Sequence, residues 1–412
     1  LTGLSNTSTF DINLSVGTAL ALGTDLSRTG AGNLTVAVTG TNQALTVNTT
    51  QSTVSGSLNL SATGNVGFGD GVDLASTSGN ISITADSEDD DTGALTMHSG
   101  TLINAGSGRI ALDAGEDITL GAIQTMNADS GGNAVTFTSS AGGVVDGSDV
   151  AVNIVANSGT VSVNVASGFG ASVAVGGAVD DAIETTISTA SITTTAGEID
   201  FVESDGITLS VLSAANTANV TVTTGGATNL NATLNNKTSG NISVTVGGDT
   251  SLAVTTPIIT TSGTVSLLAD DDVTFTAGAD ITTSTANITI TADNDSDASG
   301  TGGTITMADG TLFNAGSGRI IINADEDIIL GGLLTTNADA GGNAVVLVSG
   351  SGGIEDAGDS HVEVVANSGT LDVTSAAGFG DGGAIETTVS EVDITANAGA
   401  IRIAETDGVT LT

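Results

Sequence analysis

The sequence predicts an all-β fold in which the chain winds into a parallel β-helix, or β-solenoid, of about sixteen rungs. Three observations favour it: alternating apolar and polar segments recur every 22 to 32 residues, a long stretch occurs twice, and large aromatic residues are scarce. Helical periodicity is missing. The competing fold is a tandem of immunoglobulin-like sandwiches, but these usually carry a core Trp or Tyr and spaced prolines. This chain has no Trp or Tyr and one Pro.

Each alternating segment has the pattern of a strand with one buried face, with Ser, Thr or Asn between the apolar residues. Such segments begin at Leu34, Leu58, Ile81, Ile110, Val135, Val161, Val220, Ile242, Val265, Ile288, Ile320, Val345 and Leu371. Gly, Asn, Ser and Asp cluster between them, and these residues suit tight turns. One such segment with two weaker ones makes a rung of about 25 residues, and parallel rungs stacked about 4.8 Å apart bury a shared core.

The chain contains a long internal repeat. Residues 101–135 and 311–345 are identical at 24 of 35 positions, with an offset of 210, and flanking matches have offsets of 207 and 202. The repeating unit is therefore about 205 residues long, and we expect a first copy at 1–208 continuous with a second at 209–412. Because the chain starts and stops at the same phase of the repeat, we expect a segment of a longer array. A two-copy protein with trimmed ends is the alternative.

Composition excludes several classes of protein. Acidic residues outnumber basic ones 46 to 5, and the net charge of −41 repels nucleic acid. The 39% apolar content and the mean hydropathy of +0.29 argue against disorder. Apolar runs fall far short of the roughly 20 residues of a membrane helix, so we expect no membrane span. The first residues also lack the features of a signal peptide, and without Cys the chain is no disulfide scaffold.

Several strand-and-turn units resemble those of a known class of protein. The units are SGNISITAD, SGRIALDAGEDITLG and SGTVSVNVASG. They resemble the β-strand-repeat surface proteins of bacteria with an outer membrane, the filamentous-haemagglutinin-like exoproteins and autotransporter passengers. The resemblance covers the whole chain through pattern and composition. It implies a right-handed parallel β-helix in a secreted or surface-attached fibrous protein that serves as stalk, adhesin or matrix.

Two acidic loops are candidate calcium sites. In the first copy Asp86, Glu88 and Asp90 alternate along a loop after a strand. The second copy repeats the alternation with three carboxylates: Asp293, Asp295 and Asp297. Alternate carboxylates on a tight loop converge on one hard cation at the start of an EF-hand loop. Here, however, position six is not Gly and position twelve is not Glu, so a solvated acidic loop is the alternative.

Two further sets of residues bear on the chemistry of the chain. Arg109 and Arg319 each precede an acidic group, and we expect them to pair with a carboxylate of their own or the next rung; metal binding by those acids is the alternative. The two histidines, His98 and His361, stand where the other copy has Ala. From these two lone histidines and no Cys, no Ser-His-Asp or Cys-His set can be assembled, and five basic residues are too few for a lyase acting on acidic sugars.

The register of the last strands of each copy follows from one charge reversal. Asp200 of the first copy corresponds to Arg402 of the second. Because a buried strand position does not accept charge reversal cheaply, we expect both to face solvent. Their apolar neighbours should then point inward: Ile199, Phe201, Ile401 and Ile403.

Together these patterns predict a structural role and no enzymatic activity. We expect a shaft segment of a secreted, repetitive extracellular filament, stalk or adhesin, located outside the cell or on its surface. Its partners would be further copies of the same repeat end to end, and glycans of the cell surface or matrix. Two alternatives remain: a carbohydrate-active β-helix enzyme using a pair among the 46 carboxylates, and a calcium-dependent binding module.

Overall fold

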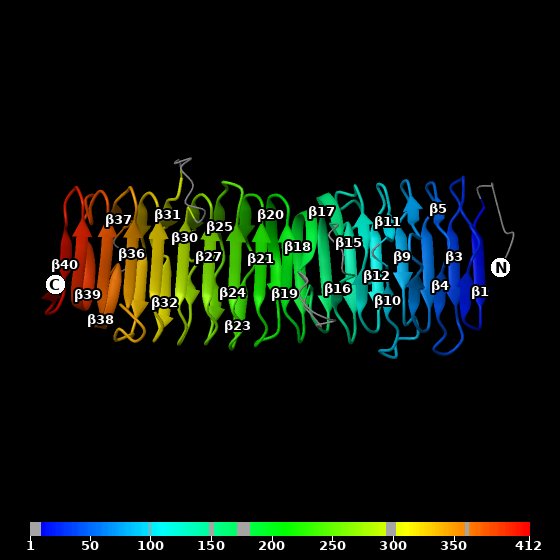
Figure 1. The fold of residues 1–412 in the computed structure, drawn as a ribbon, viewed down its shortest axis with the longest axis horizontal. Helices are drawn as coiled ribbons and strands as arrows, with labels where there is room; N and C mark the ends of the chain where they lie inside the picture. The colour runs from blue at the N-terminus through cyan, green and yellow to red at the C-terminus, as the bar shows by residue number, and fades with distance from the viewer. Residues whose placement is uncertain (1–9, 99, 148–151, 171–181, 294–301, 359–361) are drawn as a thin grey trace. The chain divides into compact units, whose positions relative to one another are not determined.

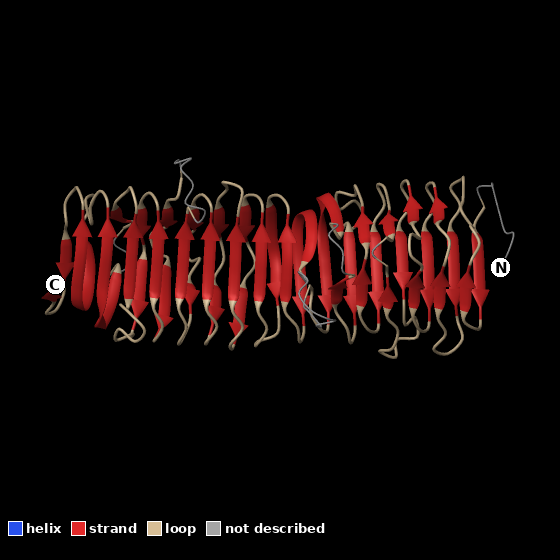
Figure 2. Cartoon of the chain, in the orientation of Figure 1, coloured by secondary structure: helices blue, strands red, loops and turns tan. Residues whose placement is uncertain are grey.

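The computed structural model describes residues 10–98, 100–147, 152–170, 182–293, 302–358 and 362–412. These residues form strands joined by loops and turns and contain no helix (Figures 1 and 2). All strand pairings with a recorded register among them are parallel. The prediction of an all-β parallel β-helix with about sixteen rungs is confirmed. Immunoglobulin-like sandwiches are excluded, because their strands pair antiparallel.

The chain divides into two compact units, each a β-helix with three strands per rung. The first comprises Leu1–Ser204 and Ser213–Ala215, and the second Asp205–Leu212 and Asn216–Thr412. The boundary expected from the sequence repeat, between 208 and 209, lies inside the short segment that the two units divide between them. We call the three stacks of strands columns A, B and C, in the order in which the chain visits them within one rung.

In the first unit, the longest strands lie in column A. Column A consists of β1 (Ile12–Val16), β3 (Leu34–Val38), β6 (Leu58–Ala62), β9 (Ile81–Thr84), β12 (Ile110–Ala114), β15 (Val135–Ser139) and the second halves of β17 (Ile154–Val165) and β18 (Ile183–Thr194). Column B consists of β2 (Leu20–Leu22), β4 (Leu45–Val47), β7 (Val66–Phe68), β10 (Leu95–Thr96), β13 (Ile118–Leu120) and β16 (Val144–Asp146). Column C consists of β5 (Gln51–Thr53), β8 (Leu74–Ser76), β11 (Leu102–Asn104), β14 (Ala122–Gln124), the first halves of β17 and β18, and part of β19 (Ile199–Glu203).

The second unit repeats the three columns. Column A consists of β21 (Val220–Thr224), β24 (Ile242–Val246), β27 (Val265–Ala269), β30 (Ile288–Ala292), β33 (Ile320–Ala324), β36 (Val345–Ser349), the second halves of β38 (Val364–Ser375) and β39 (Ile385–Ala396), and β41 (Thr410–Leu411). Column B consists of β20 (Ile207–Ser213), β22 (Thr228–Leu230), β25 (Leu252–Val254), β28 (Val273–Phe275), β31 (Ile305–Met307), β34 (Ile328–Leu330) and β37 (Ile354–Asp356). Column C consists of β23 (Leu234–Lys237), β26 (Ile258–Thr260), β29 (Ile281–Thr282), β32 (Leu312–Gly316), β35 (Gly332–Thr335), the first halves of β38 and β39, and β40 (Ile403–Glu405).

The alternating segments form column A, and their apolar residues form the core. Ile12 pairs with Leu34, and Ile288 pairs with Ile320, so the register advances by one sequence period at each rung. Leu34, Val36 and Val38 are at most 1% exposed. Because side chains alternate between the two faces of a strand, the intervening Thr and Ala residues stay at the surface. Small branched side chains therefore fill the interior, as expected from the scarcity of large aromatic residues.

Polar side chains also enter the interior, at the corner between columns C and A. Thr125 Oγ1 donates a hydrogen bond to the Gly108 carbonyl at 2.5 Å, and Thr335 Oγ1 donates to the Gly318 carbonyl at 2.6 Å. Two basic residues occupy the same place in their units, Arg28 in the first and Lys237 in the second. Both are 2% exposed, and burial lowers the pKa of Lys237 to about 8. The carbonyl groups of the corner thus determine which polar side chains this part of the core accepts.

The charge-reversal prediction is borne out for the register in both units. Ile199 and Phe201 are fully buried, and Asp200 between them is half-buried. Arg402 is exposed as expected. Ile401 bridges the buried Phe379 as Ile199 bridges the buried Phe169, so it keeps the inward register. Ile401 is nevertheless 51% exposed and Ile403 half-buried, because no described column-B strand pairs with Ile401 on its other side.

Candidate functional site

Many acidic and amide side chains hold consecutive rungs together at the corners. Asp117 Oδ1 accepts a hydrogen bond from the Gly143 backbone N–H at 2.9 Å, and the equivalent Asp327 Oδ1 accepts one from Gly353 at 2.7 Å. Other corner residues use their Oδ1 in the same way: Asp11, Asn33, Asn65, Asp73, Asn80, Asn219, Asn241, Asp272, Asp280 and Asn287. Asp and Asn side chains at the corners therefore satisfy backbone donors of the following rung.

A second recurring hydrogen-bonding group ties a glycine-rich loop to the next rung. Asp339 Oδ1 accepts from the backbone N–H groups of Ala344 and Thr370, and its Oδ2 accepts from Thr370 Oγ1 at 2.8 Å. Asp129 makes the same three contacts in the first unit. Burial opposes ionisation of Asp339, but the hydrogen bonds from Thr370 and Ala344 and the charge of Arg319 outweigh it and lower its pKa. This Asp is thus built to stay ionised and to hold the loop.

In the predicted acidic loop of the first copy, each of the three carboxylates accepts a hydrogen bond from a different residue. Asp86 is 7% exposed, and its Oδ1 accepts from Asp90 N–H. Glu88 Oε1 accepts from Asn42 N–H at 2.8 Å, and Asp90 Oδ1 accepts from Thr92. Burial, with Asp90 nearby, raises the pKa of Asp86. Among the described residues these carboxylates do not gather within 4.8 Å of one another.

The matching loop of the second copy lies largely outside the described residues. Asp293 is described and has a left-handed backbone, with φ of 58°. Asp295 and Asp297 lie outside the described residues. Calcium binding by the two loops therefore stays a prediction.

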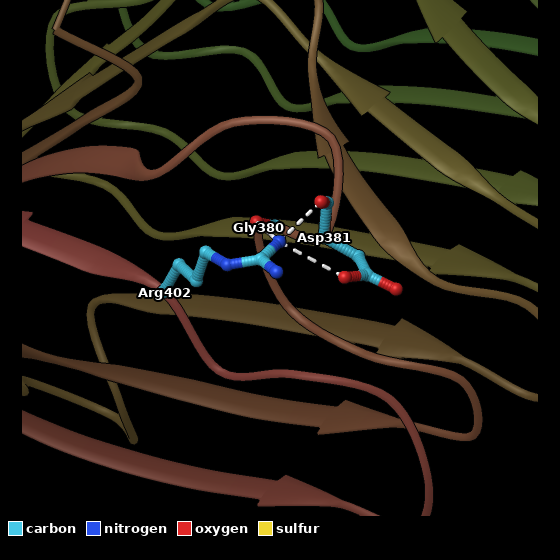
Figure 3. A network of polar contacts seen from close by, with 3 residues as sticks. All are labelled: Gly380, Asp381 and Arg402. Carbon is cyan, nitrogen blue, oxygen red and sulfur yellow. Dashed lines mark hydrogen bonds and ion pairs between the residues drawn. The ribbon is translucent and has the colours of Figure 1, made fainter.

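The ion pairs expected between Arg109 or Arg319 and a carboxylate are not formed in the described residues. Arg109 donates to the Gly131 carbonyl, and Arg319 Nε donates to the Asn343 carbonyl at 2.8 Å. Each arginine directly precedes a column-A strand, and its guanidinium reaches the glycine-rich loop of the next rung. The carbonyl groups of that loop lie closer to the guanidinium than any carboxylate does. Arg402 makes the one ion pair found in the described part of the chain, at 2.9 Å from Asp381. Figure 3 shows its guanidinium directed at Asp381 and Gly380.

One cluster of three carboxylates, which the sequence patterns did not indicate, lies in the second unit. Asp356 ends β37, Glu363 directly precedes β38, and Glu386 is the second residue of β39. One carboxylate oxygen from each lies within 4.8 Å of the other two. Glu363 is 0% exposed, and burial with the adjacent Glu386 raises its pKa to about 8. Two residues of one rung and one of the next thus bring three carboxyl groups together around the buried Glu363.

The hydrogen bonds of this cluster are incomplete. Glu363 Oε2 accepts from the Glu386 backbone N–H at 2.7 Å, and Asp356 Oδ1 accepts from the Gly358 N–H at 2.7 Å. Glu363 Oε1 is buried and has no hydrogen-bond partner among the described residues. A buried acceptor without a donor is costly, so this oxygen is the one atom of the cluster whose partner is missing.

The first unit has a different set at the equivalent place: Asp146, Asn153 and Glu184. The Asn153 amide nitrogen donates to Asp146 Oδ1 at 3.0 Å. The Asn153 side-chain oxygen accepts from the Glu184 N–H at 3.0 Å. The neutral amide of Asn153 thus donates one hydrogen bond through its nitrogen and accepts one through its oxygen. The exchange of Asn153 for Glu363 was visible in the sequence, but only the rung register shows that it lies beside Asp356 and Glu386.

An open groove of about 850 Å³ runs over the first unit at the corner that follows column A. Its acidic lining residues are Asp91, Glu116, Asp117 and Glu198, and the rest are small, mostly Gly and Ala. Asp117 is already engaged with Gly143 N–H. His98, the histidine that lies in the described part of the chain, does not line the groove. The groove thus offers acidic and small side chains for contact with a ligand.

No protein-family model, curated protein or solved structure matches this chain. The described residues also contain no helix of the length and apolarity needed to cross a membrane.

Proposed function

We propose that the chain is a structural shaft segment of a secreted, repetitive surface filament, stalk or adhesin. One observation carries this proposal: in both units the acidic side chains at equivalent corners accept backbone N–H groups of the next rung, as Asp117 and Asp327 do. These groups are committed to holding rungs in register. The resemblance to bacterial surface-repeat proteins supports a location outside the cell or on its surface.

We propose further copies of the same repeat as the first partner. The last rung of the second unit leaves Ile401 51% and Leu411 73% exposed. Apolar side chains at the end of a β-solenoid are normally covered by another rung or a cap. A second copy with the same repeat phase would supply a rung with matching apolar columns. Glycans of the cell surface or matrix are the proposed external ligands.

The test is the association state of the purified chain. We expect electron microscopy to show end-to-end assemblies and sedimentation velocity to show a mass that grows with concentration. The double variant Ile401→Lys, Leu411→Lys should shift the protein towards monomer, because charge on an apolar rung opposes stacking. As a matched control, Val211→Lys changes an apolar residue that is 40% exposed elsewhere and should leave association unchanged. A wild-type chain that stays strictly monomeric at high concentration would contradict the proposal.

The enzyme alternative has its own assay. If the acidic groove of the first unit cleaved glycosidic bonds, the chain would release reducing ends from glycans, and Glu116→Gln or Glu198→Gln would lower the rate. We expect no turnover above background for the wild type. Measurable turnover lost in either variant would replace the structural proposal with an enzymatic one.

A further inference from the structure

The three carboxylates Asp356, Glu363 and Glu386 have the spacing of ligands around one ion. Two oxygens bound to the same Ca²⁺ at about 2.4 Å lie at most about 4.8 Å apart. One oxygen from each of the three residues meets this limit. Carboxylate oxygens are also the ligands that hard divalent cations prefer. The geometry therefore suits a shared cation.

The second observation is the missing partner of Glu363. Its side chain is fully buried, its Oε2 is bonded to the Glu386 N–H, and its Oε1 has no donor. Neither of the other two residues supplies one, since ionised carboxylates only accept hydrogen bonds. A positively charged group at the centre of the cluster would satisfy Oε1 and favour the ionised form of all three carboxyl groups.

Protein cations do not fill this role in the described residues. The one ion pair in the described residues joins Arg402 to Asp381, and Arg402 also donates to the Gly380 carbonyl (Figure 3). The same short loop brings Gly383 close to the cluster. A Cβ on Gly383 would lie 3.4 Å from Asp356 Oδ2. Gly383 therefore comes close to Asp356 without placing a side chain beside it.

The first unit shows what the same backbone does without a third carboxylate. There the Asn153 amide nitrogen donates to Asp146, and the Asn153 oxygen accepts from Glu184 N–H. Asn153 therefore has a donor nitrogen where Glu363 has the oxygen Oε1 that lacks a partner. At this position the first unit has Asn153, which supplies a hydrogen-bond donor, and the second unit has Glu363, whose Oε1 lacks one.

We propose that Asp356, Glu363 and Glu386 bind one hard divalent cation, with calcium as the preferred ion. Calcium takes six to eight oxygen ligands, so water or loop carbonyls would complete the shell. The site belongs to the second unit alone, because the first unit has Asn153 in place of Glu363. It is independent of the shaft proposal, since a cation could bind there whatever the chain does.

The test is calorimetric titration of metal-free protein with CaCl₂ and, separately, with MgCl₂. We expect the wild type to bind one more Ca²⁺ per chain than Glu363→Asn, a variant that copies the first unit and should fold as it does. Asp356→Asn keeps an acceptor for the Gly358 N–H and should lose the same single site. Mg²⁺ should bind at least tenfold more weakly, because it demands a smaller, near-octahedral shell.

The control is Glu116→Gln, which removes one exposed negative charge from the first unit. It should bind as many Ca²⁺ ions as the wild type, which separates loss of a site from loss of net charge. Equal stoichiometry in the wild type and in both Asp356→Asn and Glu363→Asn would overturn the proposal and leave a proton as the occupant of Glu363 Oε1. Loss of the site in the control as well would also overturn it.

Discussion

The two equivalent corner clusters show how one side chain changes the chemistry of a repeated backbone. Around Asn153 an amide donates to one acid and accepts from the backbone of another residue, and both of its functional groups are used. Around Glu363 the same strands hold a third carboxylate with one oxygen unpartnered. In both units the buried apolar residues of the columns hold the backbone in the same conformation. A corner residue can therefore change from an amide that links two neighbours to a carboxylate that can bind a cation. The following predictions test this comparison, from the largest expected effect to the smallest.

The phenylalanine that leads into each cluster should differ in its contribution to stability. Phe169 lies between Phe137 and Phe201, with ring centroids 6.4 and 6.1 Å away, whereas Phe379 bridges Ile354 and Ile401. We expect Phe169→Ala to cost about 4–5 kcal/mol and Phe379→Ala about 3 kcal/mol, because aromatic pairs add to the burial contribution. Urea unfolding followed by circular dichroism measures both. Equal losses would show that the aromatic neighbours contribute nothing extra.

The buried basic residues should respond differently to pH. Burial lowers the pKa of Lys237 to about 8, so unfolding takes up a proton between about pH 8 and the normal lysine pKa of about 10.5. The stability of the folded chain should therefore rise with pH across this window. Lys237→Met should remove that rise and add about 1–3 kcal/mol at pH 7. Arg28→Met is the matched control and should leave the pH dependence unchanged, since a guanidinium does not titrate there. A flat wild-type profile would contradict the prediction.

Exchanging the central cluster residues should move stability in opposite directions when a chelator is present. Glu363→Asn should raise the free energy of unfolding by about 1–2 kcal/mol, because it replaces a buried carboxylate that lacks a donor with an amide. Asn153→Glu should lower it by a similar amount in the first unit. Denaturant titrations in EDTA measure both. If the two substitutions shift stability in the same direction, the equivalence of the clusters is wrong.

The smallest effect concerns the exposed pair of Arg402 and Asp381, whose side chains are 51% and 56% exposed. Arg402→Ala should cost less than about 1 kcal/mol, and the loss should shrink at high salt. The control Asp200→Ala changes the equivalent residue of the first unit. A loss well above 1 kcal/mol from Arg402→Ala would mean that the loop at Gly380 depends on this contact.

The fold was accessible from the sequence because one signal repeats many times. Each column-A strand alternates as Leu34–Val38 does, and its burial follows that alternation. A pattern of period two predicts which face is buried without knowledge of any partner. The spacing between such segments then predicts how the chain returns to column A, so the parallel rungs follow from local information.

The acidic cluster was not accessible because it depends on the register of the weaker columns. Asp356 and Glu363 lie on one rung and Glu386 on the next, and column-B and column-C strands of about three residues carry little alternation. The arginine prediction failed for a related reason. Opposite charge close in sequence favours an ion pair, but Arg319 found the carbonyl of Asn343 across one rung. Both the acidic cluster and the contact of Arg319 therefore depend on which residues of neighbouring rungs lie side by side.

The loop after Phe169 and Phe379 shows how tolerant a rung is of changes in chain length. Eleven residues separate Gly170 from Ala182, whereas three separate Gly380 from Ala384. The strands that follow keep the same pairing, Ile183 with Phe201 and Ile385 with Ile403. A difference of eight residues in chain length therefore leaves the pairing of the following strands unchanged. A peptide epitope or a small binding motif inserted after Gly380 should be displayed at a fixed place on the second unit, which makes this corner a natural point for variation and for engineering.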